Sequence, residues 1–436
     1  MTHLEIKWPD AMVEQVRAAR GRLERAGEAL RAMSLEQRLQ STARILGDWT
    51  APDSPWRREL VTAFAADSPF HEDTVREGLD AALRAWKPEE LIACVRRELA
   101  AVLESDDVVL SPFDWTAVLA GGTIPMPTML SVLLPLILGS PVLLRETSND
   151  GATAALLKRS LKAQNGTLAR AFEHLAFAAE DVAFDTLLEA PCIVATGSDE
   201  TIRSLSSRLR PSQRFLAYGH RFSIGVLGPA LEFDDEAIGQ AAEGFALDVA
   251  RWDQTGCLSP VVVYLVGFDP SAEKGFARTI SRALEKVARK MPRGEITTAV
   301  AASHANERAE ARMRQASGET SGDPPRQTMS FEGGDYTVIL EANTEPRPAP
   351  LYRFLRLMPV DSLEKLARVL GPFSGQISNV AIAGFSPGEV DALRRSLFHF
   401  GASRVTEPGR LQTPPIDWPH DGMPLLTPIA RFAQSG

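Results

Sequence analysis

The sequence has few cysteines and none of the patterns with which cysteine and histidine usually bind metals. Its three cysteines, Cys94, Cys192 and Cys257, are too few and too widely spaced for a disulfide framework, which favours a reducing compartment. No two cysteines have zinc-ligand spacing, and the seven histidines include no H-x-x-x-H pair. We therefore expect a cytoplasmic protein without a metal site.

Long hydrophobic runs and an excess of positive charge are also missing. The longest apolar run, 129–138, is too short to span a bilayer, and residues 1–9 lack the apolar segment of a signal peptide. Lys and Arg number 47 against 56 Asp and Glu, a net charge of -9, which argues against a nucleic-acid-binding surface. We expect no membrane span and no nucleic-acid partner.

The length and the periodicity predict an α/β protein of several domains. A chain of 436 residues is too long for one ordinary core. Residues 1–105 have the spacing of a helical layer, with Ser34 as an N-cap, and beyond Val108 strands alternate with helices as in parallel sheets. The predicted domains are the helical layer 1–105 of the cofactor domain, a dinucleotide-binding domain 106–224, a catalytic α/β domain 225–402 and an extended arm 403–436. The predicted strands are 115–120, 141–145 and 190–196, then 223–227, 261–267, 336–341, 354–360 and 379–384.

Three predicted strands of the first sheet end in unusual turns. Ligands of open parallel sheets bind at the carboxyl ends of the strands. Gly121-Gly122-Thr123, Arg145 to Ser148, and Thr196-Gly197-Ser198 lie at such ends, where backbone N–H groups and a helix N-terminus can hold phosphate. A turn like the third is most often a simple turn and N-cap, and the sequence has neither G-x-G-x-x-G nor a Walker A motif.

Cys257 stands in a polar, glycine-containing turn, 251–260, directly before an apolar strand. Such a turn holds a reactive group over a rigid scaffold, although an isolated cysteine is most often a small buried hydrophobe.

Two other segments are predicted without a chemical role. Residues 317–328 have the composition of a mobile surface loop. The proline-rich arm contains His420 and Asp421, which we interpret as part of a packed or oligomer-bridging segment, because neighbours on an extended chain point apart.

Taken in order along the chain, these segments resemble the aldehyde dehydrogenase superfamily, and more narrowly the fatty acyl-CoA reductases of the bacterial bioluminescence type. The resemblance covers nearly the whole chain, and its most specific parts surround Cys257 and Trp418. The segments are 120–125 (AGGTIP), 142–145 (VLLR), 196–198 (TGS), 217–220 (AYGH), 253–260 (DQTGCLSP) and 418–422 (WPHDG).

The resemblance implies two parallel-sheet domains with a cleft between them, and a C-terminal arm that returns to the cofactor domain or to an oligomer partner. It implies a homodimer or a higher homo-oligomer. Cys257 would attack the thioester of an acyl-CoA or an acyl carrier, and hydride from the cofactor would release the aldehyde. The backbone N–H of Cys257 would help to hold the oxyanion.

The resemblance also implies cofactor residues. Arg145 corresponds to a basic residue beside the adenosine ribose, and Ser148 replaces a glutamate that would repel a 2′-phosphate. We therefore expect NADPH at least as readily as NADH. Gly121 and the turn of Thr196, Gly197 and Ser198 would hold the pyrophosphate.

Two departures from the family pattern affect the chemistry. In hydrolytic relatives a glutamate near the position of His220 activates water, and the absence of a carboxylate here fits a reductase. His220 would tune the thiol, move a proton or only form hydrogen bonds with the backbone. Gly122 replaces an oxyanion-binding asparagine, so Thr123 or a backbone N–H would have to substitute. The alternatives are reduction of an acyl phosphate or an acyl-carrier thioester, or a catalytically silent binding protein.

Overall fold

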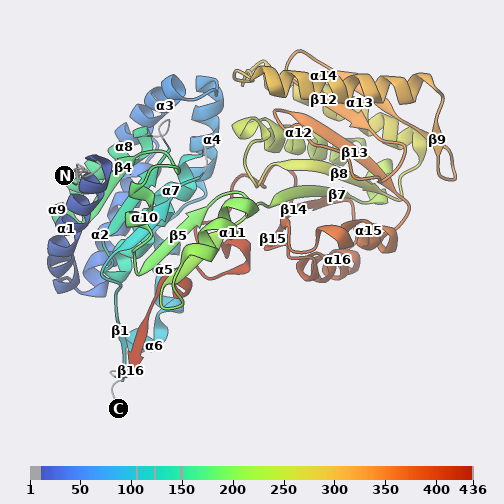
Figure 1. Ribbon diagram of the computed structural model, residues 1–436. Coiled ribbons are helices and arrows are strands. Elements are labelled where there is room, and N and C mark those ends of the chain that lie inside the picture. The colour runs from blue at the N-terminus through green and yellow to red at the C-terminus, as the bar shows by residue number, and fades with distance from the viewer. Residues whose placement is uncertain (1–10, 105–106, 122–123, 148–150, 435–436) are drawn as a thin grey trace, which may run out of the picture.

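The computed structural model describes residues 11–104, 107–121, 124–147 and 151–434, and it contains two large sheets (Figure 1). Within these two sheets, neighbouring strands are parallel except for the antiparallel pair of β11 and β12. The predicted α/β class is confirmed. In spatial order, the first sheet contains β4 (Phe172–Ala176), β3 (Val142–Glu146), β2 (Thr116–Leu119), β5 (Cys192–Thr196) and β6 (Arg214–Tyr218); the second contains β11 (Met329–Glu332), β12 (Thr337–Leu340), β13 (Phe354–Val360), β8 (Pro260–Val266), β7 (Phe222–Leu227), β14 (Ile377–Ala383) and β15 (Arg404–Thr406).

Helices cover both faces of the first sheet, because its strands are apolar on both sides. Ser34 caps one of these helices in a capping box with Gln37, as its position predicts. The helices on one face are α1 (Ala11–Ala32), α10 (Ala183–Leu187) and α11 (Asp199–Arg208); those on the other are α2 (Leu35–Thr50), α7 (Pro125–Leu138) and α8 (Gly151–Gln164), with α3 (Pro55–Asp67), α4 (Glu72–Arg84) and α5 (Pro88–Glu98) packed outside them. Two short helices follow longer ones along the chain: α6 (Ala100–Glu104) comes after α5, and α9 (Gly166–Arg170) comes after α8.

The second sheet is also covered on both faces. Its two apolar faces form separate cores, one beneath each helix pair. The helices are α12 (Asp235–Ala250) and α13 (Pro270–Ala288) on one face, α15 (Leu363–Leu370) and α16 (Pro387–His399) on the other, and α14 (Thr298–Ala316) beside β11 at the sheet edge.

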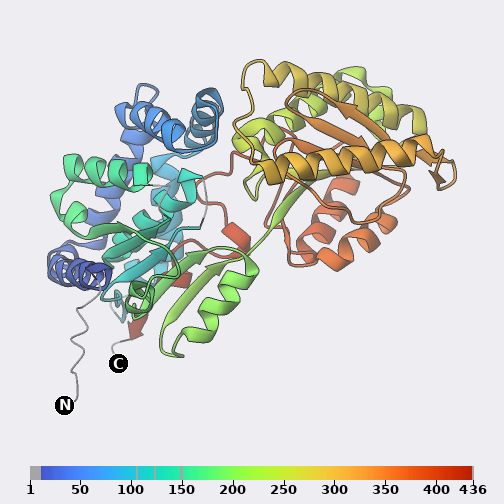
Figure 2. The ribbon, with the colours of Figure 1, turned by 45° about the horizontal axis from the view of Figure 1, so that its top comes forward.

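The chain passes from the first sheet to the second between Tyr218 and Phe222 (Figure 2). This passage comes earlier than the predicted domain boundary at residue 224, because Phe222 already pairs with Ile377 of β14. Residues 219–221 are thus the direct link between the two domains.

Residues 317–328 form a small hairpin, not the predicted mobile loop. Its strands are β9 (Thr320–Ser321) and β10 (Arg326–Gln327). Arg326 is buried and makes ion pairs with Glu273 at 2.7 Å and Asp361 at 2.9 Å. The polar composition concealed this pairing, because both carboxylates come from distant segments.

The tail returns to the first domain, where β16 (Phe432–Gln434) pairs with β1 (Val108–Leu110) as a projecting ribbon (Figure 1). On the way it crosses α12 and α5. Asp248 accepts hydrogen bonds from the backbone of Gly409 and Leu411, and Glu98 accepts three from 425–427. No helix among the described residues is long and apolar enough to cross a membrane, and those residues include no cluster of metal ligands. The oligomeric state remains a prediction.

Candidate active site

Cys257 follows α12 and an unusual turn, η2 (Arg251–Gln254), and directly precedes β8. Trp252, Asp253 and Gln254 have φ angles of 54°, 46° and 64°. The left-handed conformation costs about 1–2 kcal/mol for each residue with a side chain. Contacts elsewhere must therefore hold this turn in place.

A second left-handed turn, 351–353, locks the first. Arg353 Nη2 lies 2.6 Å from Asp253 Oδ1, and both side chains are buried. Gln254 donates to the carbonyl oxygens of Phe354 at 2.9 Å and Pro260 at 2.8 Å, and accepts from the Phe354 N–H at 2.8 Å. The two turns thus fix each other at the base of the cysteine loop.

Trp252 fastens the turn to the helical N-terminal layer. Its ring packs edge-on against Phe64 and Phe70, with centroids at 6.3 and 5.7 Å. The ring also lies against Gly78 of α4, where an added Cβ would come within 2.5 Å of it. The N-terminal helices therefore position the cysteine as well as covering the first sheet.

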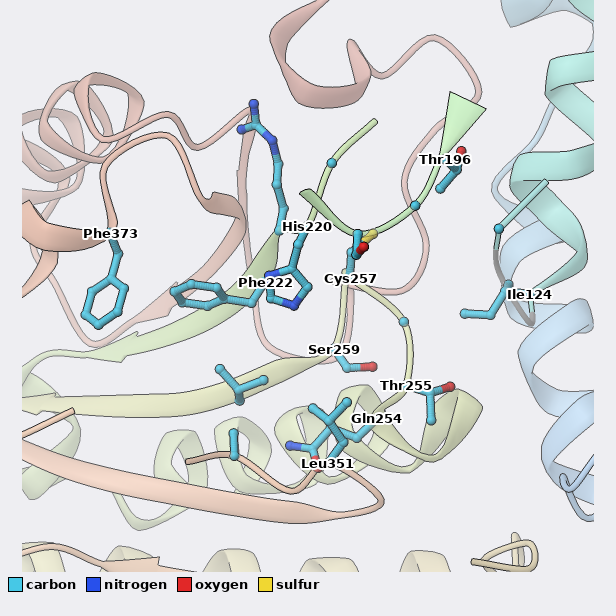
Figure 3. A pocket seen from close by; sticks show the side chains of 18 of the residues that line it. Ile124, Thr196, His220, Phe222, Gln254, Thr255, Cys257, Ser259, Leu351 and Phe373 are labelled. Atoms are coloured by element: carbon cyan, nitrogen blue, oxygen red, sulfur yellow. The ribbon is translucent and has the colours of Figure 1, made fainter. Parts of the chain in front are cut away.

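A cleft of about 670 Å³ lies between the domains, and Cys257 is exposed in its wall (Figure 3). Figure 3 shows Cys257 between Thr196 of the first domain and Phe222 of the second. Cys94 and Cys192 are buried, so the interpretation of an isolated cysteine as a core residue applies to them and is wrong for Cys257. The predicted site residues that line the cleft are Gly121, Thr196, Gly197, Ser198, His220 and Cys257.

The surroundings of Cys257 favour the neutral thiol. Although Cys257 is exposed in the cleft, the protein packed around its thiol removes water and raises the pKa of Cys257 to about 12, and the charge of Asp421 acts in the same direction. The N–H groups of Cys257 and Leu258 and the charge of Arg221 lower the pKa less. Ser223 Oγ donates to the Cys257 carbonyl oxygen at 2.8 Å, which holds the loop but leaves the sulfur free. Because the thiolate is the nucleophile, this site needs a proton acceptor.

A second cavity, of about 140 Å³, meets the cleft at Cys257. Cys257 and Thr196 line both cavities, and no described aspartate or glutamate lines either one. The second cavity is largely apolar. Its walls include Trp86, Met126, Leu130, Leu134, Leu216, Trp252, Ile416, Trp418, Leu425 and Ile429.

The first-domain side of the cleft is suited to phosphate. Ser198 caps α11, whose N-terminus lies on this side, and its Oγ accepts from the Thr201 N–H at 3.1 Å. Gly121 lies so close to Thr196 that an added Cβ would be 2.0 Å from the Thr196 carbonyl oxygen. The turn and Cys257 line the same cleft, so these residues can hold part of a nicotinamide cofactor.

Among the predicted site residues that the structure describes, Arg145 does not line the cleft. Arg145 is only 8% exposed; its Nε donates to the Phe177 carbonyl oxygen at 2.8 Å, and its guanidinium lies over the Phe177 and Phe184 rings. The side chain of Arg145 is therefore engaged with Phe177 and Phe184 in this arrangement, and its role beside the ribose stays a prediction. Gly122, Thr123 and Ser148 lie outside the described residues.

Two histidines border the site. His220 is exposed in the cleft, and its backbone N–H donates to Asp199 Oδ1 at 2.8 Å. His420 lines the apolar cavity together with Cys257. The interpretation that His420 and Asp421 point apart is wrong: Nε2 and Oδ1 are 3.8 Å apart, because the short turn η4 (His420–Gly422) replaces the extended chain and Asp421 has a φ of 54°. The only signal for this turn in the sequence is the Asp-Gly dipeptide.

Comparisons with known proteins agree with this architecture. The family model described as acyl-CoA reductase (LuxC) matches residues 30–432. No individually curated protein is similar enough in sequence to match the chain.

Three solved structures illustrate the shared fold. An NADP-dependent enzyme of E. coli has a TM-score of 0.71 at 14% identity, over 97% of this chain and 90% of the other. Indole-3-acetaldehyde dehydrogenase AldA of P. syringae, in complex with NAD+ and IAA, has a TM-score of 0.73 at 12% identity, over 97% and 88%. Glyceraldehyde-3-phosphate dehydrogenase GapN of Methanocaldococcus jannaschii, in complex with NADP, has a TM-score of 0.68 at 11% identity, over 98% and 95%.

At this identity the solved structures show the fold, and the family model shows the family. The predicted resemblance is confirmed on both levels. With the aldehyde dehydrogenase fold and a family match over nearly its whole length, the chain belongs to the acyl-CoA reductase (LuxC) family of acyl reductases.

Proposed function

We propose that this protein reduces a fatty acyl-CoA to the aldehyde with NADPH, through a thioester between the acyl group and Cys257. The observation that carries the proposal is that Cys257 lines both the cleft and the apolar cavity. An acyl chain in the apolar cavity would bring its carbonyl carbon to the sulfur, while CoA and then the cofactor would approach Cys257 from the larger cleft.

In the proposed reaction the Cys257 thiolate attacks the acyl carbon, the bond to the CoA sulfur breaks, and the acyl group stays on the enzyme. The N–H of Cys257 donates to the oxyanion of the addition step. When bound, the nicotinamide cofactor supplies the hydride that reduces the acyl carbon. The absence of a carboxylate from the described lining supports reduction over hydrolysis, because no such group is there to activate water.

Arg145 and Ser148 support NADPH over NADH, since one is cationic and the other neutral. To reach a 2′-phosphate, Arg145 would exchange its hydrogen bond with the Phe177 carbonyl for the phosphate. This exchange is part of the proposal, and NADH is the alternative cofactor.

The test is incubation of the protein with decanoyl-CoA, first without cofactor and then with NADPH or NADH. We expect CoA release and an acyl mass on Cys257 in the first step, and decanal in the second, faster with NADPH. Cys257→Ser abolishes both steps, whereas Cys94→Ser, at a buried thiol, retains them. An unmodified Cys257 would favour a silent binding protein, and acylation only by an acyl phosphate or an acyl carrier would change the substrate.

A further inference from the structure

The arm carries a group of polar side chains to the wall of the apolar cavity. His420 is stacked on Tyr218, with ring centroids 4.4 Å apart and an interplanar angle of 13°, and it lies against Trp418 at 4.8 Å. The two aromatic neighbours fix the plane of the imidazole. About 26% of the His420 side chain is exposed, and both His420 and Cys257 line the cavity.

Asp421 and Arg221 complete this group. Asp421 is 6% exposed; its Oδ1 lies 3.8 Å from His420 Nε2, and its Oδ2 lies 3.2 Å from Arg221 Nε. Arg221 also donates to the carbonyl oxygens of Ile377 and Gly401. The carboxylate is therefore anchored to the interdomain link and to the second domain.

The environment of His420 keeps its imidazole in the neutral form. Burial lowers the pKa of His420, and the charge of Arg221 also lowers it, while Asp421 raises it. The imidazole is therefore neutral at pH 7 and able to accept a proton. Asp421 also raises the pKa values of Cys257 and of Tyr218, the residue on which His420 is stacked. Its carboxylate therefore acts on the thiol and on a neighbour of the histidine as well as on the histidine itself.

We infer that His420 is the proton carrier of Cys257 and that Asp421, held by Arg221, is its positioning residue. The inference rests on the proposed function. His420 takes the proton from the sulfur as the bond between sulfur and acyl carbon forms, and gives it to the CoA thiolate as the bond to CoA breaks. One proton moves from Cys257 to CoA in this half-reaction, and nothing is oxidised or reduced.

The experiment follows acylation by decanoyl-CoA without nicotinamide, as CoA release and acyl mass on Cys257, from pH 5 to 9. We expect His420→Gln to slow acylation by about a hundredfold to ten-thousandfold. The wild-type rate falls as the pH drops through the pKa of His420, because the protonated ring cannot accept. In Asp421→Asn this fall moves to lower pH, since Asp421 raises the pKa of His420.

His399→Gln, at an exposed position on α16, is the matched control and retains the wild-type rate. Asp421→Asn keeps the stacked ring and carries the same test if His420→Gln does not fold. Acylation by folded His420→Gln at the wild-type rate and pH profile would overturn the inference and leave the proposed function standing. Loss of acylation in His220→Gln in its place would also overturn it. A wild-type protein that is never acylated would contradict the proposed function itself.

Discussion

Asp253 and Arg353 are the residues that join the two left-handed turns beneath Cys257. Both side chains are buried, so the pair is shielded from water and salt. Removing one member of such a pair leaves an uncompensated buried charge, which typically costs about 3–5 kcal/mol.

We therefore predict that Asp253→Asn lowers the free energy of unfolding by about 3–5 kcal/mol, measured by urea titration. The matched control is Glu364→Gln, which removes an exposed partner of Arg368 and changes stability by less than about 1 kcal/mol. Equal losses in the two variants would show that the buried pair does not hold the turn.

At the scale of single residues, the sequence predicts well which residues have a chemical role. It predicts poorly which of them lie close together in the structure. Cys257 and Ser198 are named by their local turns, and the structure places both in one cleft. The sequence does not reveal that His420 and Cys257 line the same cavity, because 162 residues lie between them and the arm must first cross two domains. Arg145 shows the converse: its position in the strand is predicted, but its side chain is turned toward Phe177.

Helix α4 contributes a surface for the ring of Trp252, and Gly78 leaves the space for it. Most residues at Gly78 would favour the helix more than glycine does, by up to about 1 kcal/mol. Contact with Trp252 outweighs that preference here.

We predict that Gly78→Ala destabilises the protein by about 1–3 kcal/mol in thermal unfolding and slows acylation of Cys257, because the methyl group displaces Trp252. Gly275→Ala, inside α13 with open space around it, is the matched control and is neutral or stabilising. A stabilised Gly78→Ala variant would contradict the role of α4 in positioning the loop.

Elements with strong periodicity are predicted and edge elements are missed. The central strands β8 and β13 are apolar runs close to the predicted 261–267 and 354–360. The edge strands β4 and β6 were not predicted, because one face of each is only half-buried and polar residues interrupt the pattern.

At the scale of the whole molecule, the C-terminal arm joins the two domains, because it forms hydrogen bonds with both of them. Glu98 of α5 accepts hydrogen bonds from the backbone of Leu425, Leu426 and Thr427 at 2.8, 2.8 and 3.2 Å. Without this carboxylate three N–H groups lose their partner.

We predict that Glu98→Ala costs about 1–3 kcal/mol and exposes the arm to trypsin, so that cleavage after Arg431 becomes faster. Glu28→Ala, at an exposed position on α1, leaves the cleavage rate unchanged. An unaltered digestion pattern in Glu98→Ala would show that the arm is held by its apolar contacts alone.

The path of the arm has a consequence for biosynthesis. Translation runs from the N-terminus, so both sheets can assemble before Trp418 and His420 emerge from the ribosome. Until that moment the apolar cavity beside Cys257 lacks the wall that Trp418 and His420 supply. Under the proposed function, a nascent chain would therefore gain its acyl-binding cavity only when synthesis of the arm is completed.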